Sequence, residues 1–298
     1  MKKLLFVYNP HAGKGLLKPK VSDIVDIFVK AGYEVVIYPT QAYHDAYKKI
    51  LTYTDRYDLV VCSGGDGTID EVVSGMMERE ERVPVGYIPT GTTNDFANSL
   101  KIPKNILAAA DNAVSGKAFP CDVGKFNDGI FVYIAAFGLF TDVSYQTKQE
   151  VKNVLGHLAY LLEGMKRLSA IRSYPMRITY GDTTIVDDFI FGMVTNSASV
   201  GGFKRITGKN VRLDDGVFEV TLIKRPKNPI ELNNIMVSLL NRDIDTDAMY
   251  CFRTSKVEIT SAEPLPWTLD GEYGGTHTKV VIENICRGVD IRVEQKES

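Results

Sequence analysis

Long apolar runs are scarce in this 298-residue sequence, and that scarcity limits the cellular compartments in which the protein is expected. The longest nearly uninterrupted run, residues 130–140, is too short to cross a bilayer as a helix. The run at residues 4–8 is too short for a signal peptide and has no small-residue cleavage site after it, so a buried first strand explains it better. We therefore expect a cytoplasmic protein.

Cysteines and net charge are also low. The four cysteines, at positions 62, 121, 251 and 286, lie far apart and form no CxxC pair, which argues against a zinc site or a disulfide framework. A formal net charge of −2 provides no overall field that would attract nucleic acid, so no nucleic-acid partner is expected. Any attraction to a membrane must come from a local patch.

Strand and helix patterns alternate through residues 1–121. Continuous apolar runs typical of buried strands are each followed by an amphipathic pattern with helical spacing. The predicted strands are residues 4–8, 34–38, 58–62 and 85–88. This alternation predicts an α/β domain with a mostly parallel, Rossmann-like sheet that is covered by helices.

After residue 121 the rhythm changes to many strands separated by turn signals. We read residues 130–137 as one strand, and we read residues 256–259, 266–269, 279–282 and 289–293 as four separate strands. Helical patterns interrupt the series at residues 142–168 and 230–241. Strands joined by hairpin turns predict an antiparallel β-sandwich over residues 122–298, whose last strand could return to the first domain.

The segment GGDGT at residues 64–68 lies between a buried strand and a helix predicted to begin near Ile69. Paired glycines let the backbone approach a ligand closely, and the helix N-terminus directs N–H groups and a positive dipole end at the loop, which suits a phosphate. Asp66 would repel phosphate unless a cation stood between them, so we interpret it as a carboxylate on the magnesium side. An ordinary glycine-rich turn is the alternative.

Two further loops follow predicted strands and should reach the same edge of the sheet, where ligands bind in open parallel sheets. PTGTTNDFA at residues 89–97 offers hydroxyls and Asp95, although Thr93 or Asn94 could simply cap a helix. NPHAGKG at residues 9–15 contains Lys14, which either contacts phosphate or is a solvated lysine. Thr40 completes a ring of four segments. Walker and GxGxxG motifs are absent, so a P-loop enzyme or a dehydrogenase is not supported.

Taken together, these segments resemble the diacylglycerol kinase catalytic family, which includes bacterial soluble lipid kinases and sphingosine kinases. The shared motifs are NPxxGKG at 9–15, GGDGT at 64–68, PTGTTNDFA at 89–97, DVG at 122–124, LDDG at 213–216 and LDGE at 269–272. NAD kinases carry a loop similar to GGDGT but nothing like PTGTTNDFA. The resemblance covers nearly the whole chain.

The resemblance implies that ATP and Mg²⁺ are the cofactors and that the nucleotide binds between an α/β domain (residues 1–121) and a lipid-substrate domain (residues 122–298). It implies that Glu272 is the base that accepts the lipid hydroxyl proton, and that Asp66, Asp95 and Asp122 organise catalytic magnesium. A second, structural magnesium is expected near Asp215, with the backbone carbonyls of Arg212 and Val217. The expected nucleotide-binding residues are Asn9, Pro10, Gly13, Lys14, Thr40, Gly64, Gly65, Asp66, Gly67, Thr68, Thr92 and Asn94.

The expected activity is transfer of the γ-phosphate of ATP to a lipid hydroxyl, with diacylglycerol the first choice and phosphatidic acid the product. The alternatives are an NAD-kinase-like kinase of a soluble substrate and a nucleotide-binding regulator without turnover. Residues 148–172 combine basic residues with an apolar helical face. They could touch the membrane transiently, or pack on the second domain or on a partner subunit. Exposed strands could pair in a homodimer.

Overall fold

A computed structural model describes residues 1–139, 172–200, 203–204, 211–241 and 247–294. The chain divides into two compact units: Met1–Asp122 together with Arg287–Ser298, and Val123–Cys286. Two strands, β5 (Lys117–Phe126) and β15 (Glu272–Val293), run from one unit into the other. The helix predicted over residues 142–168 and nearly all of the basic segment 148–172 fall outside the described residues. In the described part of the chain, no helix is both long enough and apolar enough to span a membrane.

The first unit is built on parallel strand pairs. Their order is β2 (Tyr33–Pro39), β1 (Lys2–Tyr8), β3 (Leu59–Gly64), β4 (Val85–Pro89) and the end of β15. Strands β3 and β4 and the middle of β1 are buried, which explains their continuous apolar runs. β5 pairs with β15 as well, and β15 continues into antiparallel pairs in the second unit, so the hydrogen-bonded ladder as a whole is mixed.

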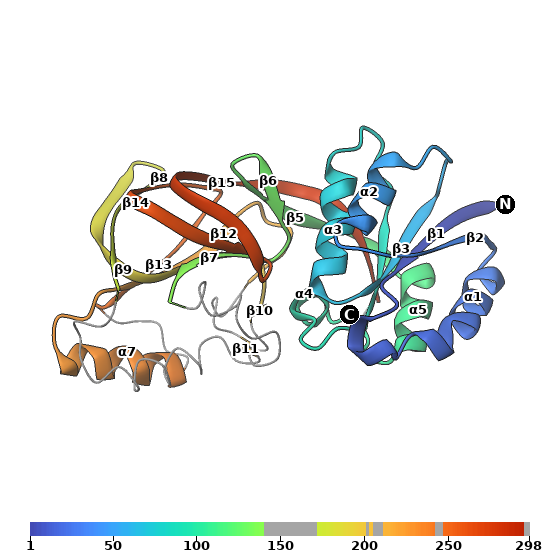
Figure 1. Cartoon of the computed structure of the whole chain (residues 1–298), viewed down its shortest axis with the longest axis horizontal. Helices are drawn as coiled ribbons and strands as arrows, with labels where there is room; N and C mark the ends of the chain where they lie inside the picture. Colours follow the sequence, from blue (N-terminus) through green and yellow to red (C-terminus); the bar gives the residue numbers. More distant parts are fainter. Residues whose placement is uncertain (140–171, 201–202, 205–210, 242–246, 295–298) are drawn as a thin grey trace. The chain divides into compact units, whose positions relative to one another are not determined.

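Helices lie on both sides of this sheet (Figure 1). α1 (Val21–Lys30) and α5 (Ile106–Ser115) pack together on one side, and α2 (Asp45–Thr52) and α3 (Asp66–Met77) pack together on the other. Short helices at Ala12–Gly15 (η1), Lys18–Lys20 (η2) and Asp95–Leu100 (α4) connect strands to longer elements. Side-chain carboxylates and amides satisfy exposed helix ends; for example, Glu71 accepts hydrogen bonds from the backbone N–H groups of His44, Ala46 and Tyr47 at the start of α2.

The second unit is antiparallel and rich in β structure, as predicted. Its central strands are β7 (Ile134–Gly138), β8 (Tyr174–Tyr180), β9 (Thr183–Thr195), β12 (Phe218–Lys224), β13 (Met249–Thr254) and β14 (Lys256–Leu269), with the first part of β15. β10 (Ser199–Val200) pairs antiparallel with β11 (Phe203–Lys204), and α7 (Pro229–Asn241) follows β12. The core centres on Trp267, whose ring meets Phe126 and Phe137 edge to face at 5.0 and 4.9 Å.

Five strand predictions in this unit were wrong in their boundaries, and one strand was missed. Residues 130–137 form two strands, β6 (Gly129–Phe131) and β7. The strands are interrupted because the backbone N–H groups of Val132, Tyr133 and Ile134 donate to the carboxylate of Asp270 instead of to a neighbouring strand. The four segments predicted between residues 256 and 293 are parts of only two strands, β14 and β15, whose pairing continues through register shifts after Thr260 and Pro266. β13 was not predicted.

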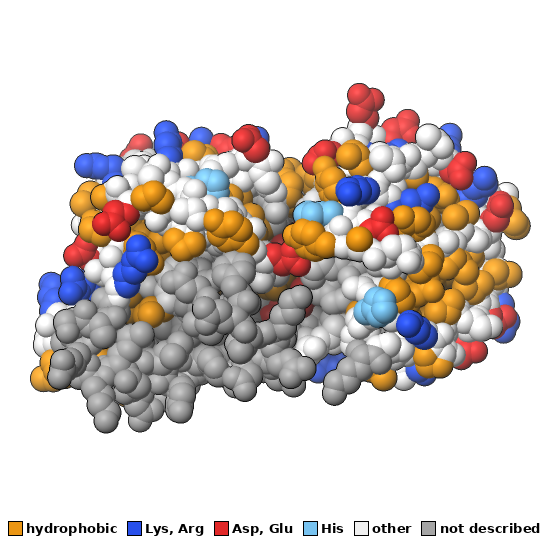
Figure 2. Space-filling model, in the orientation of Figure 1, with side chains coloured by type: hydrophobic (Ala, Val, Ile, Leu, Met, Phe, Trp, Pro, Cys, Tyr) orange, Lys and Arg blue, Asp and Glu red, His pale blue; other side chains and the backbone are white. Residues whose placement is uncertain are grey.

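Charge is spread over the surface. Figure 2 shows acidic and basic side chains interspersed on the visible face of each unit.

Candidate active site

Chain segments that follow the parallel strands meet at one edge of the first unit's sheet. The backbone N–H of Asn9, just after β1, donates to the carbonyl oxygen of Ser63 near the end of β3, at 2.8 Å. The N–H of Thr40, just after β2, donates to the carbonyl of Tyr8 at 2.9 Å, and Thr40 is buried. Parallel strands present their carboxyl ends to the same edge, so residues distant in the sequence become neighbours there.

The loop after β4 lies directly against the glycines that follow β3. The N–H groups of Thr90 and Gly91 both donate to the carbonyl of Gly64, at 2.8 and 3.2 Å. A Cβ atom added to Gly91 would lie 2.5 Å from the Cα of Gly65, which is closer than side chains allow. The two loops therefore touch backbone to backbone, and glycine is required for that approach.

The loop at residues 9–15 joins the same contact. Gly13 has a φ of +56°, and a Cβ atom added to it would lie 1.9 Å from the carbonyl oxygen of Thr90. Pro10 begins the turn that leads into η1, and Lys14 lies within η1. The structure thus brings together the three glycine-bearing loops that the sequence singled out.

Gly13→Ala is expected to displace this loop, because the added methyl would overlap the Thr90 carbonyl. If the loop binds nucleotide, KM for ATP should rise about tenfold or more, equivalent to roughly 1.4 kcal/mol of binding. Gly32→Ala is the matched control: its φ of +88° costs a similar left-handed strain, but nothing lies within 4 Å of the added Cβ. Steady-state kinetics against ATP would contradict this assignment if both variants gave the same KM.

The helix after the GGDGT segment begins earlier than predicted. α3 starts at Asp66 instead of near Ile69, and Gly65 is its N-cap with extended backbone angles of −88° and −170°. Asp66, Gly67 and Thr68 therefore lie in the first helical turn, where the unbonded N–H groups and the positive dipole end are found. This start places the dipole beside Gly64 and Gly65, closer to the glycines than the sequence pattern suggested.

Two of the three aspartates predicted to organise catalytic magnesium, Asp66 and Asp95, come from adjacent segments of the first unit. The Oδ1 atom of Asp66 accepts the backbone N–H of Phe96 at 3.3 Å, and Phe96 follows Asp95 in the first turn of α4. Asp95 is buried, whereas Asp66 is partly accessible. The structure thus brings these two carboxyl-bearing segments together.

The side chain of Asn94 forms hydrogen bonds within its own loop and does not cap α4. It occupies the N-cap position with a φ of +52°, but its Oδ1 accepts the N–H of Gly91 at 3.0 Å and its Nδ2 donates to the Gly91 carbonyl at 2.9 Å. Thr93 makes no side-chain cap either, because Asn94 holds that position, and Thr92 is exposed at the tip of the loop.

Tyr87 is a site residue that the sequence did not reveal. Its hydroxyl donates to the Gly64 carbonyl at 3.2 Å and lies 3.4 Å from the Oδ1 atom of Asn94. Tyr87 therefore contacts both glycine-bearing loops, the one after β3 and the one after β4. Burial, with a smaller contribution from the charge of Asp66, raises the pKa of Tyr87 well above its ordinary value, so the phenol stays a donor. An aromatic residue within a strand gives no sign of this role in sequence.

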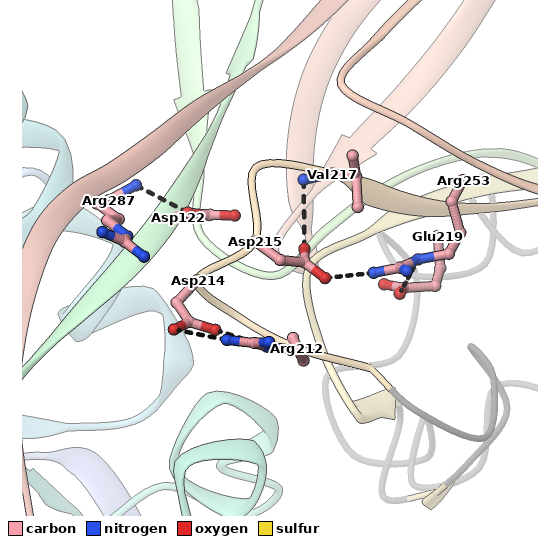
Figure 3. A network of polar contacts seen from close by, with 8 residues as sticks. All are labelled: Asp122, Arg212, Asp214, Asp215, Val217, Glu219, Arg253 and Arg287. Carbon is pink, nitrogen blue, oxygen red and sulfur yellow. Dashed lines mark hydrogen bonds and ion pairs between the residues drawn. The ribbon is translucent and has the colours of Figure 1, made fainter.

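Asp122 has a structural partner. It is fully buried on β5, and its Oδ1 atom accepts the backbone N–H of Arg287 at 2.7 Å (Figure 3). Arg287 has a φ of +54°, so this bond fixes a left-handed residue within β15. The predicted metal role of Asp122 remains a prediction.

Glu272 stands at the start of β15 in the second unit, directly after a tight turn. Its side chain is exposed, and the preceding residues Asp270 and Gly271 have φ angles of +50° and +88°. The buried carboxylate of Asp270 accepts the N–H groups of Val132, Tyr133 and Ile134 at 2.5, 2.9 and 2.9 Å. Asp270 therefore anchors the turn that presents Glu272, a role that the LDGE motif did not disclose.

Of the residues predicted to hold a structural magnesium, Asp215 makes an ion pair with Arg253, and the side chain of Arg212 makes one with Asp214. Asp215 accepts a hydrogen bond from the guanidinium of Arg253, and its Oδ1 atom lies 3.4 Å from the backbone N of Val217 (Figure 3). The side chain of Arg212 donates from two nitrogens to the carboxylate of Asp214, at 3.2 and 3.3 Å.

Glu219 completes this network. Its Oε1 atom pairs with the Nε of Arg253 at 3.2 Å, and the residue is 6% exposed. Burial raises the pKa of Glu219 to about 7, and the guanidinium of Arg253 offsets part of that effect.

Nowhere in the described ranges do three or more His, Cys, Asp or Glu side chains converge as a complete metal site. Mg²⁺ commonly takes one or two carboxylates and completes its shell with substrate phosphates and water, so the carboxylates of Asp66 and Asp95 fit that requirement. Asp215 does not fit it, because a guanidinium already lies on its carboxylate and would repel a divalent cation.

Fold and site together define a class of protein: an α/β unit with glycine-rich loops at one sheet edge, followed by an antiparallel unit that presents a glutamate on a hairpin. Residues 3–126 match the family model described as the diacylglycerol kinase catalytic domain. Residues 136–291 match a model described as the YegS C-terminal NAD kinase beta sandwich-like domain. The chain belongs to the diacylglycerol kinase catalytic-domain family, and it is a kinase.

Several relatives match along most of their length. The diacylglycerol kinase of Bacillus subtilis is 34% identical over 277 residues, which cover 92% of this chain and 91% of the relative. The diacylglycerol kinase of Staphylococcus carnosus is 34% identical over 276 residues, which cover 92% of this chain and 90% of the relative. A solved diacylglycerol kinase structure from Bacillus anthracis superposes with a TM-score of 0.78 at 25% identity, covering 98% of this chain and 97% of that one.

Proposed function

We propose that this protein transfers the γ-phosphate of ATP to a lipid hydroxyl, with diacylglycerol as the acceptor and phosphatidic acid as the product. The observation that carries the proposal is the backbone-to-backbone meeting of three glycine-bearing loops at one edge of the first unit. Relatives named diacylglycerol kinase, 34% identical over nine-tenths of the chain, support the choice of acceptor.

In this proposal the first unit is a Rossmann-like domain that binds the nucleotide. The second unit is a β-sandwich of the NAD-kinase-like type that binds the lipid. Backbone N–H groups at Gly65 and at the start of α3 bind phosphate oxygens, helped by the helix dipole, and Gly64 lies directly beside them at the end of β3. The loop around Gly13 and Lys14 encloses the phosphates from one side. The remaining contacts come from the other residues expected to bind nucleotide, namely Asn9, Pro10, Thr40, Gly67, Thr68, Thr92 and Asn94.

Magnesium, when bound with ATP, neutralises phosphate charge as the transfer proceeds. Asp66 and Asp95 would hold it, with Asp122 orienting its waters. The side chains of Asp66 and Asp95 belong to adjacent segments, so one ion could draw on both without further protein ligands.

Glu272 is the proposed general base. Its carboxylate accepts the proton of the lipid hydroxyl, the hydroxyl oxygen bonds to the γ-phosphorus, and the bond from that phosphorus to the bridging oxygen breaks to release ADP. The acceptor resides in a bilayer, so we further propose that the protein meets the membrane surface transiently.

A radiolabelled transfer assay tests the proposal. The chain, with ATP and Mg²⁺, would be offered diacylglycerol, phosphatidylglycerol, a sphingoid base, ceramide, an isoprenoid alcohol and, separately, NAD. We expect label to appear in phosphatidic acid at a rate at least tenfold above that of any other acceptor. Label in NAD alone would overturn the lipid assignment, and ATP binding without transfer to any acceptor would indicate a regulator.

A further inference from the structure

Two carboxylates of the second unit share a single guanidinium. Glu219 on β12 lies directly opposite Arg253 on β13 in the antiparallel register, and the Nε of Arg253 meets the Oε1 of Glu219 at 3.2 Å. The Nη2 atom of the same arginine pairs with Oδ2 of Asp215, which precedes β12 (Figure 3). Both ion pairs thus depend on one strand register.

These carboxylates are poorly hydrated. The side chains of Glu219 and Asp215 are 7% and 19% exposed, against 50% for that of Arg253. The second oxygen of Glu219, Oε2, is buried and has no hydrogen-bond partner among the described residues. Buried carboxylates require a nearby cation, and the ion pairs of both Asp215 and Glu219 within the described ranges come from Arg253.

A structural metal at Asp215 would conflict with this arrangement. The carboxylate that would coordinate it already receives a guanidinium on one oxygen and faces the backbone N–H of Val217 on the other. A divalent ion beside that guanidinium would place like charges against each other at a site of low hydration.

We propose that Arg253 is the resident counter-cation of Asp215 and Glu219 and takes the place of a second, structural metal ion in this chain. Cross-strand pairing fixes the guanidinium where it serves both carboxylates, so this part of the second unit is stable without metal. The inference concerns the second unit alone and stands apart from the transfer reaction.

Thermal unfolding of the full chain, without ATP, in EDTA and then in millimolar Mg²⁺ tests the proposal. Arg253→Gln should lower Tm in EDTA by roughly 4 °C or more, because both carboxylates lose their cation. Mg²⁺ should restore part of that loss in Arg253→Gln, and Arg253→Gln/Asp215→Asn should not show the recovery. Arg177→Gln, which alters an exposed arginine of β8, is the control and should behave as the wild type.

Comparison of the wild type with Asp215→Asn keeps the test decisive even if Arg253→Gln fails to fold. We expect Mg²⁺ to shift both Tm values equally, and we expect elemental analysis to find no tightly held metal that Asp215→Asn loses. The proposal is overturned by one equivalent of metal that disappears with Asp215→Asn. It is equally overturned by an Arg253→Gln variant as stable in EDTA as the wild type.

Discussion

Glu272→Gln is expected to lower kcat about 10²–10⁴-fold while leaving KM for ATP unchanged. The amide cannot accept the proton of the acceptor hydroxyl, whereas the loops proposed to bind nucleotide belong to the other unit. The side chain is exposed at the start of β15, so Tm should stay within about 2 °C of the wild type. Initial rates of transfer to diacylglycerol, with thermal unfolding alongside, provide the measurement.

The control for this change is Glu263→Gln, which alters a glutamate of β14 with a 71% exposed side chain in the same unit. It should retain wild-type kcat. Full activity in Glu272→Gln would remove Glu272 from the reaction, and a large loss of Tm would mean that the substitution acts through the fold.

Asp270→Asn is expected to reduce both stability and turnover. An amide has one acceptor oxygen, and its NH₂ group would face backbone N–H donors that the carboxylate now satisfies at Val132, Tyr133 and Ile134. The loss of buried, charge-assisted hydrogen bonds should cost roughly 3 kcal/mol of unfolding free energy. Because the turn that presents Glu272 would shift, kcat should fall on the order of 10²-fold even where the variant is fully folded.

Urea unfolding and steady-state kinetics at a temperature well below Tm separate these two effects. A positioning role requires kcat to fall while KM for ATP stays constant, whereas a purely structural role predicts normal kcat in the folded fraction. Asp182→Asn, in the exposed turn between β8 and β9, is the matched control and should change neither quantity.

Local patterns were sufficient for the first unit's elements. The buried runs around Leu5, Val61 and Ile88 predicted strands within one or two residues, because a strand covered on both faces must be continuously apolar. The start of α3 was misplaced because Asp66, Gly67 and Thr68 are weak helix formers, and tertiary contacts with the neighbouring loop override that preference.

Local patterns were insufficient where a distant side chain intervenes. The break between β6 and β7 lies in an apolar run that reads as one strand, and it arises from Asp270, 138 residues away from Val132 in the chain. The long strands β14 and β15 were divided in the prediction because bulges and glycines interrupt their alternation, although backbone pairing continues across these irregularities.

The sequence by itself determined the family, the glycine-bearing loops and the glutamate of the LDGE motif, because each is a short pattern whose chemistry depends on neighbouring residues. Only the tertiary structure decided that Tyr87 joins two loops, that Asp270 holds the turn before Glu272, and that Arg253 is the cation at Asp215. These contacts depend on strand register and on long-range pairing. A carboxylate in the sequence shows neither whether it is buried nor which cation lies beside it.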